Sequence, residues 1–379
     1  MPIRITIILT SLLLLAACVP TTPLEDLAII NTRGVDISEE NRNQIETTIL
    51  SYQFDSQSQD ISQILSGTGS TIKSAREDAS RETGFNLSPG QIRLELYGKE
   101  AAQNGILQYI SSAVRDARVS ETMLLAITNN SAKEVLTEGQ EGLSHDFGKY
   151  LYNLIEKEID EDSIPNVYLH EFTHLESDIG QDLVVPIIEL EEGKPKISSI
   201  ALFQGDKYVD EISFHEGYLV NLMQKTTKST PSEIAVPIKP FLPYIDKKRG
   251  ETDVNDLYLN VNIEKGKSKT KLTNFQDLHF DTTINIKLNL LETSVLLSVE
   301  NKDVANLLEK EIGKAFTRKY EALLAKLQEA GSDPFGLGTI YRAKKRDSPL
   351  TDEEWREKFP DVTVDFHVNV ELTNYGGIQ

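Results

Sequence analysis

The sequence predicts a multi-domain α+β protein. Strand-like and helix-like segments alternate up to about residue 190, which is typical of a mixed α/β unit. In the last third, apolar and polar residues alternate with a period of two, as in a sheet with one buried face. A stripe of apolar residues, mostly four apart, predicts a long helix over 302–330. We expect three mixed α/β domains, the last one an antiparallel sheet packed by this helix.

Composition excludes several classes of protein. The chain has 379 residues, with 39 Lys and Arg against 59 Asp and Glu, and its net charge is -20. Such acidity disfavours binding to nucleic acid, which draws its affinity from basic residues, and it disfavours a polybasic hold on anionic lipid. A single cysteine excludes an internal disulfide framework and any metal site built from several thiolates. Because the chain is acidic, we expect no nucleic-acid partner.

The N-terminus has the pattern of a bacterial lipoprotein signal peptide, which we place at residues 1–17. Arg4 supplies a positive end, and a mainly apolar run follows it. This run is about half of the ~20 residues that a membrane-spanning helix needs, so it fits a signal-peptide core. Ala16 and Ala17 lead directly into Cys18, the only cysteine, as in a lipobox. We expect diacylglycerol on Cys18; an ordinary secretory signal with an incidental cysteine is the alternative.

The first domain after a lipidated tether at 18–23 is expected to span 24–190. Apolar residues at helical spacing follow Thr71, and Gly84 lies just past that segment. A polar stretch at 51–63 shows no strand pattern, and the run 191–196 has the composition of a linker. The predicted strands are 24–37, 91–97, 121–128 and 183–188, and the predicted helical segments begin at 71 or span 99–117, 131–137 and 142–159.

Two further domains are expected at 197–255 and 256–379. The first begins with a hairpin and a helical stretch, and the second contains the long helix, with Asn301 as its N-cap and Gly331 just past its end. Trp355, the only tryptophan, is expected to anchor the C-terminal fold. The predicted strands of these domains are 197–203, 209–213, 257–263, 284–290 and 362–372.

One motif carries possible metal chemistry. Residues 170–174 read His-Glu-Phe-Thr-His, which matches H-E-x-x-H, a helical zinc motif with a glutamate as general base. The residues after it contain no third-ligand signature, and His215 and His279 fall in segments of the other predicted domains. We therefore assign no catalytic, metal-binding or cofactor-binding residue. A lipid-anchored zinc metallopeptidase stays open as an alternative.

Short motifs occur in a characteristic order along nearly the whole mature chain. They are Gly69-x-Thr71-Ile72 with Ala75, Gly98 to Ile106, Arg115-Asp116, Asp182 to Pro186, Ile200 to Phe203 with Asp206-Lys207, Gln328 to Gly338, Trp355, and Phe359 to Val362 before an alternating terminal strand. In this order, and together with the lipobox, they resemble the Ger(x)C family, the lipoprotein C subunits of spore germinant receptors. The chain departs from that family at Val19-Pro20-Thr21 and at Gln91, positions that bear on the receptor subtype.

The resemblance implies a non-catalytic subunit of three α+β domains on the outer face of the spore inner membrane. Its implied partners are an integral-membrane A subunit and a permease-like B subunit that senses the nutrient. The subunit would support receptor assembly or transmit the signal that triggers germination. No cofactor is implied beyond the covalent lipid on Cys18. A solute- or polymer-binding lipoprotein of a transporter is a further alternative.

Replacing the lipidated residue tests the anchor. We expect Cys18→Ala to move the protein from the membrane fraction to the soluble fraction, or to leave its precursor unprocessed, because no thiol remains to carry lipid. Fractionation and metabolic labelling with a radioactive fatty acid measure this, with Thr22→Ala as the matched control. A Cys18→Ala protein that stays processed and membrane-bound would contradict the prediction.

Overall fold

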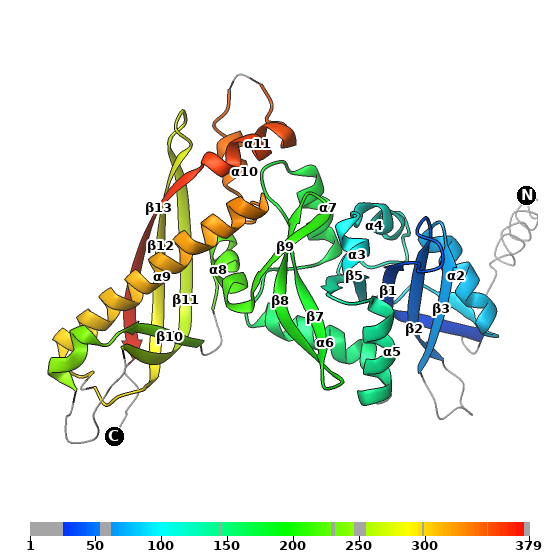
Figure 1. Ribbon diagram of the computed structural model, residues 1–379, viewed down its shortest axis with the longest axis horizontal. Helices are drawn as coiled ribbons and strands as arrows, with labels where there is room; N and C mark the ends of the chain where they lie inside the picture. Colours follow the sequence, from blue (N-terminus) through cyan, green and yellow to red (C-terminus); the bar gives the residue numbers. More distant parts are fainter. Residues whose placement is uncertain are drawn as a thin grey trace, which may run out of the picture.

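The computed structural model describes residues 26–53, 62–143, 146–228, 232–245, 255–297, 299–346 and 348–374. The expected signal peptide, the tether and Cys18 lie outside the described residues. The described chain forms an elongated body, in which two sheets follow one another along the long axis (Figure 1). Both parts combine helices with strands, so the predicted α+β class is confirmed.

The first sheet has a parallel centre. β1, β5, β6 and β7 run parallel to one another, and the short β4 also pairs parallel with β1. Antiparallel strands extend both edges, with β2 and β3 beyond β1, and β8 and β9 beyond β7. The strands are β1 (Leu27–Ile37), β2 (Ile45–Gln53), β3 (Ser62–Gly69), β4 (Asn86–Ser88), β5 (Leu94–Gly98), β6 (Leu124–Thr128), β7 (Val184–Glu191), β8 (Lys194–Gln204) and β9 (Lys207–Ser213).

Helices cover this sheet because parallel strands need crossover connections. In Figure 1, α5 and α6 lie below the strands, and α3 and α4 lie above them. α2 packs closely on β3, where a Cβ atom at Gly67 would lie 2.3 Å from the backbone nitrogen of Ala79. The helices are α2 (Ile72–Ala79), η3 (Ser80–Glu82), α3 (Lys99–Gln103), α4 (Leu107–Val114), α5 (Ala132–Leu143), α6 (Phe147–Asp160), α7 (Leu169–Ser177) and α8 (Phe214–Gln224).

The second sheet has the strand order β10-β11-β12-β13. One strand pair differs from the predicted antiparallel arrangement, because β13 runs parallel to β12. The long helix α9 lies between these two strands in the chain and supplies the crossover that parallel pairing requires. The predicted alternation places its apolar residues inside, as expected for a sheet covered on one face. The strands are β10 (Ser232–Pro237), β11 (Asp256–Asn274), β12 (His279–Thr293) and β13 (Thr363–Asn374).

The long helix α9 (Lys302–Ala330) confirms the predicted range and both of its ends. The side chain of Asn301 accepts a hydrogen bond of 2.9 Å from the backbone N–H of Asp303, and Gly331 ends the helix with a φ of 66°. Its apolar stripe is buried and packs against β13 and β10. In the described part of the chain, no helix is long and apolar enough to cross a membrane. The other helices of this part are η4 (Lys239–Tyr244), α10 (Leu337–Arg342), α11 (Asp352–Lys358) and η6 (Phe359–Asp361).

Three local predictions in the first part were wrong in extent. The sequence predicts no strand in 51–63, but β2 ends and β3 begins within this range. The apolar alternation typical of a strand is missing because β2 buries the polar residues Thr47, Thr48 and Ser51. The single helix expected over 99–117 is divided into α3 and α4, with Gly105 at a φ of 101° between them. The short turn expected over 131–137 is the start of the longer helix α5.

The run 191–196 is a hairpin turn rather than a linker. Glu192 and Gly193 have φ values of 52° and 76°, as a two-residue turn between antiparallel strands requires, and they connect β7 to β8. β8 and β9 therefore extend the first sheet, whereas β10 belongs to the second. The hydrogen bonds between β7 and β8 continue through residues 190–197. The division of the chain into domains at 24–190, 197–255 and 256–379 stays a prediction.

Candidate functional site at the junction of the two sheets

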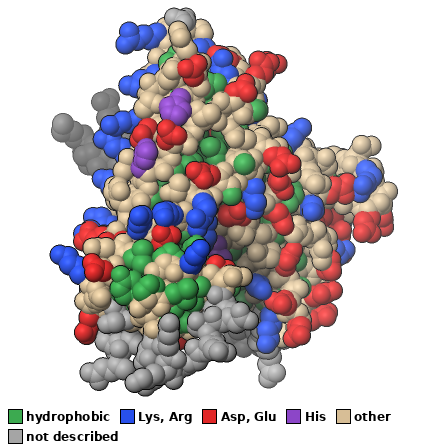
Figure 2. All heavy atoms as spheres, turned by 60° about the vertical axis from the view of Figure 1, so that its left-hand side comes forward, with side chains coloured by type: hydrophobic (Ala, Val, Ile, Leu, Met, Phe, Trp, Pro, Cys, Tyr) green, Lys and Arg blue, Asp and Glu red, His purple; other side chains and the backbone are tan. Residues whose placement is uncertain are grey.

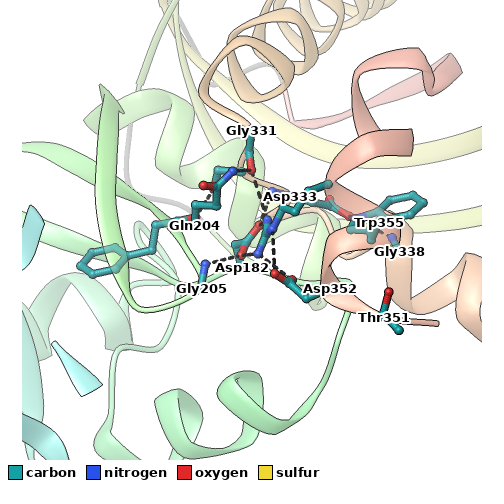
Figure 3. Close-up of polar contacts among 12 residues, drawn as sticks. Asp182, Gln204, Gly205, Gly331, Asp333, Gly338, Thr351, Asp352 and Trp355 are labelled. Carbon is teal, nitrogen blue, oxygen red and sulfur yellow. Dashed lines mark hydrogen bonds and ion pairs between the residues drawn. The ribbon is translucent and has the colours of Figure 1, made fainter. Parts of the chain in front are cut away.

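Residues from distant sequence motifs meet where the first sheet contacts the end of α9 and the helices after it (Figure 3). We call Asp182, Gly331, Asp333, Trp355 and Arg356 the polar junction. Asp182 precedes β7, Gly331 and Asp333 follow α9, and the other two residues lie on α11. Long-range contacts of this kind decide how the two parts of the molecule sit against each other.

The centre of the polar junction is an ion pair between Asp182 and Arg356. The Asp182 side chain is only 2% exposed, and both of its oxygens accept from the Arg356 guanidinium, one of them from Nη2 at 2.6 Å. Asp182 also accepts from the backbone N–H groups of Gly205, at 3.0 Å, and Asp333, at 2.7 Å. This one carboxylate therefore ties together the β8–β9 turn, the segment after α9, and α11.

Arg356 is held by further acceptors. Its Nη1 donates to the backbone carbonyl of Gly331 at 3.1 Å, and Asp352, one turn earlier on α11, lies 3.0 Å from Nη2. A cation beside the last carbonyls of α9 is favoured by the helix dipole. The pKa of Arg356 is raised because the hydrogen bonds and charges of Asp182 and Asp352 outweigh the cost of burial. The guanidinium therefore stays charged at any ordinary pH.

Asp333 is the second buried carboxyl group and is fully enclosed. Its Oδ2 accepts from the backbone N–H of Gly338 at 2.9 Å and from Nε1 of Trp355 at 3.1 Å, while Oδ1 has no partner among the described residues. Burial, together with the nearby negative charge of Asp182, raises the pKa of Asp333 to about 7. A proton on Oδ1 would remove the cost of an unpaired buried charge.

Two backbones touch beside these carboxylates. A Cβ atom on Gly180 would lie 2.3 Å from the backbone carbon of Gly338, and the backbone N–H of Thr339 donates to the Gly180 carbonyl at 3.0 Å. Gly180 also has a φ of 104°, which favours glycine. Trp355 closes the site by stacking on Tyr341, with ring centroids 5.6 Å apart. Trp355 is 1% exposed, so its predicted anchoring role is confirmed.

Other contacts join the two parts around the polar junction. The Ser332 hydroxyl donates to the Phe203 carbonyl at 2.6 Å, within buried surroundings. Further along α9, Lys326 pairs with Glu216 of α8 at 2.7 Å. The remaining hydrogen bonds of this kind are Gln204 to the Gly331 carbonyl, Gln224 to the Pro334 carbonyl and Tyr320 to the Leu219 carbonyl. These contacts add to those of the polar junction in joining the two parts.

A second pair of predicted motifs meets inside the first part. The backbone N–H of Ile106 donates to the Asp206 carbonyl at 2.9 Å, and that of Leu107 donates to the Asp206 carboxylate at 3.2 Å. A Cβ atom at Gly105 would lie 2.5 Å from this carboxylate. The motif at 98–106 and the motif at 206–207 thus form one structural unit, in which the β8–β9 turn caps the start of α4.

The H-E-x-x-H residues do lie on a helix, α7. The rings of His170 and His174 have centroids 6.5 Å apart, and His170 stacks on Tyr168. Glu171 lies 3.5 Å from the His170 ring nitrogen Nε2. Within the part of the chain that the structure describes, no group of three or more His, Cys, Asp or Glu side chains could hold a metal ion. His215 and His279 lie on α8 and β12, and neither belongs to such a group among the described residues.

The structure thus brings together motif residues whose positions in the sequence do not show that they are in contact. Asp182, Gly331, Asp333 and Trp355 were all noted in the sequence, whereas Arg356 was not. The available signal was its place next to Trp355, one helical turn after Asp352, on a segment that starts with acidic residues. Its main partner is 174 residues away, so no local pattern could identify it.

Comparison with known proteins gives one consistent result. Residues 20–190 match the family described as spore germination protein N-terminal domain, and residues 198–376 match the family described as spore germination B3/GerAC like, C-terminal. The chain is 21% identical to the spore germination protein GerQC of Bacillus cereus, over 96% of both chains. It also resembles the crystal structure of the GerBC protein, with a TM-score of 0.53 and 17% identity, over 90% of this chain and 97% of that one.

Removing the cation of the polar junction should destabilise the protein strongly. We expect Arg356→Gln to lower the free energy of unfolding by about 3 kcal/mol, because Asp182 would remain buried without its charge partner. Urea unfolding followed by circular dichroism measures this. Glu357→Gln, an exposed neighbour on α11, is the control and should change the free energy by less than about 0.5 kcal/mol. Equal effects of the two substitutions would contradict a structural role for the pair.

The raised pKa of Asp333 makes stability depend on pH. The carboxyl group binds its proton more tightly in the folded protein than in the unfolded chain, where the pKa is 3.8. Its contribution to the free energy of unfolding is therefore full below about pH 4 and is lost as pH rises through about 7. Asp333→Asn, which is neutral throughout, should flatten the decline between pH 5 and 8 in urea unfolding. An unchanged slope would contradict the prediction.

Proposed function

The chain belongs to the Ger(x)C family of spore germination proteins, and on that premise we propose that it is the lipid-anchored, non-catalytic C subunit of a spore germinant receptor. Its role in this proposal is to support assembly of the receptor or to transmit the signal that starts germination. The partners are an integral-membrane A subunit and a permease-like B subunit that senses the nutrient. The location is the outer face of the spore inner membrane.

The observation that carries this role is the buried pair of Asp182 and Arg356. A buried ion pair is costly to separate, because each charge would lose its partner in a poorly solvated site. With the hydrogen bonds of Asp333 beside it, the pair holds the two sheets as one body. A body whose two sheets are joined in this way suits a subunit that positions other subunits.

The anchor places this body close to the membrane. Cys18 precedes the first strand residue, Leu27, by nine positions, which span at most about 30 Å when fully extended. Two or more acyl chains on one cysteine give durable attachment without any basic surface. This accounts for a membrane location in a chain with a net charge of -20. The first sheet then lies nearest to the bilayer and to the integral-membrane subunits.

Germination of spores that lack the protein tests the role. We expect deletion of its gene, in a strain without a redundant paralogue, to abolish the response to the nutrient of this receptor, while the response through an unrelated receptor is kept. Loss of optical density after nutrient addition measures germination. Re-introduction of the unchanged gene should restore the response, and Cys18→Ala should restore it poorly. An intact response to every nutrient in the deletion strain would refute the proposal.

A further inference from the structure

The lining of a small cavity in the first part contains five cations. It has a volume of about 290 Å³ and lies between α2, the end of α4 and the loop that follows it, with β1 at its floor. We call it the basic pocket. Its charged lining residues are Arg33, Lys73, Arg76, Arg115, Arg118 and Asp116.

The charge of the basic pocket is the reverse of the charge of the whole chain. Five cations and one carboxylate line it, whereas acidic residues outnumber basic ones by 59 to 39 in the sequence. Only Arg118 is neutralised within the lining, through a two-pronged contact with Asp116 at 2.7 and 2.8 Å. Lys73, Arg76 and Arg115 have no carboxylate within ion-pair distance among the described residues. Three cations therefore remain available to an anion.

The floor of the basic pocket is a buried and only partly satisfied guanidinium. Arg33 is 3% exposed and donates from Nη2 to Glu95, its neighbour on β5, at 2.6 Å. This is a single contact rather than a two-pronged one, and Arg33 Nε and Glu95 Oε1 both have no hydrogen-bond partner in the described structure. Buried polar groups are rarely left unpaired, so an unpaired donor in a cavity lining requires an explanation.

The cations are close enough to oppose one another. The pKa of Arg76 is lowered, first because the group is partly buried and then because the charges of Arg118 and Arg33 repel it. Gathering like charges in this way costs free energy, and a bound anion would offset that cost. The planar fork of arginine matches the oxygens of phosphate and carboxylate groups.

We propose that the basic pocket binds a small, multiply charged oxyanion of the phosphate class. Its volume lies just below the usual range for small-molecule sites, so a phosphate group fits inside it. Such a group can come from a free anion or from the headgroup of a phospholipid, because the lipidated Cys18 lies fifteen positions before Arg33 in the chain. The anion site does not depend on the receptor role, although the lipid source depends on the anchor.

Binding can be measured on the full mature protein in a non-ionic detergent. We expect inorganic phosphate, at constant ionic strength, to raise the melting temperature and to give saturable heat in calorimetry. Arg76→Gln should weaken phosphate binding at least tenfold, because it removes one charge-assisted contact. Arg115→Gln, on the exposed rim, should weaken it in the same direction without affecting folding. Arg81→Gln, an exposed arginine just beyond α2 that pairs with Asp78, is the matched control.

The two sources of phosphate are separated by a second probe. Monomeric short-chain phosphatidylglycerol replaces inorganic phosphate, with short-chain diacylglycerol as its counterpart without phosphate. If inorganic phosphate binds and Arg76→Gln weakens this binding, the ligand is a free anion. If only phosphatidylglycerol binds and Arg76→Gln weakens this binding, the ligand is a lipid headgroup. The inference is overturned if neither probe binds, or if Arg76→Gln and Arg81→Gln bind equally well. That result would leave the germination test of the receptor role unaffected.

Discussion

The arrangement of the whole molecule depends on one buried carboxylate. Asp182 receives the Arg356 guanidinium and two backbone N–H groups, from Gly205 and Asp333, and these donors come from three separate segments. A carboxylate in a poorly solvated site is stable only when such donors surround it. Each donor segment is therefore held in place by the same group. The first sheet, the end of α9 and α11 could not separate without leaving this charge unpaired.

The residues around Asp182 also limit which side chains this site can accept. Gly180 and Gly338 bring two backbones into contact, so a side chain at either position would push the two parts of the molecule apart. Asp333 fills the remaining space with a carboxyl group that gains a proton more readily than an exposed one. A second full negative charge beside Asp182 would repel it, and protonation of Asp333 removes that repulsion.

The sequence predicted helices and strands well where residues close together in the chain determine the structure. Helix α9 follows from its apolar spacing, from the Asn301 cap and from the glycine at 331, all of which act within a few residues. The predictions failed where pairing is long-range. Strand β2 buries Thr47 and Thr48 against partners that no local pattern reveals, and β13 pairs parallel with β12 because of the connection between them. Arg356 could not be assigned for the same reason.

The contacts at the polar junction restrict how the two sheets can move relative to each other. If the two sheets cannot hinge about Asp182, a displacement at the second sheet must move the first sheet with it. In the proposed receptor, a change in the other subunits would shift the whole body relative to the membrane. Such a role requires shape, stiffness and an anchor, and it requires no reaction site.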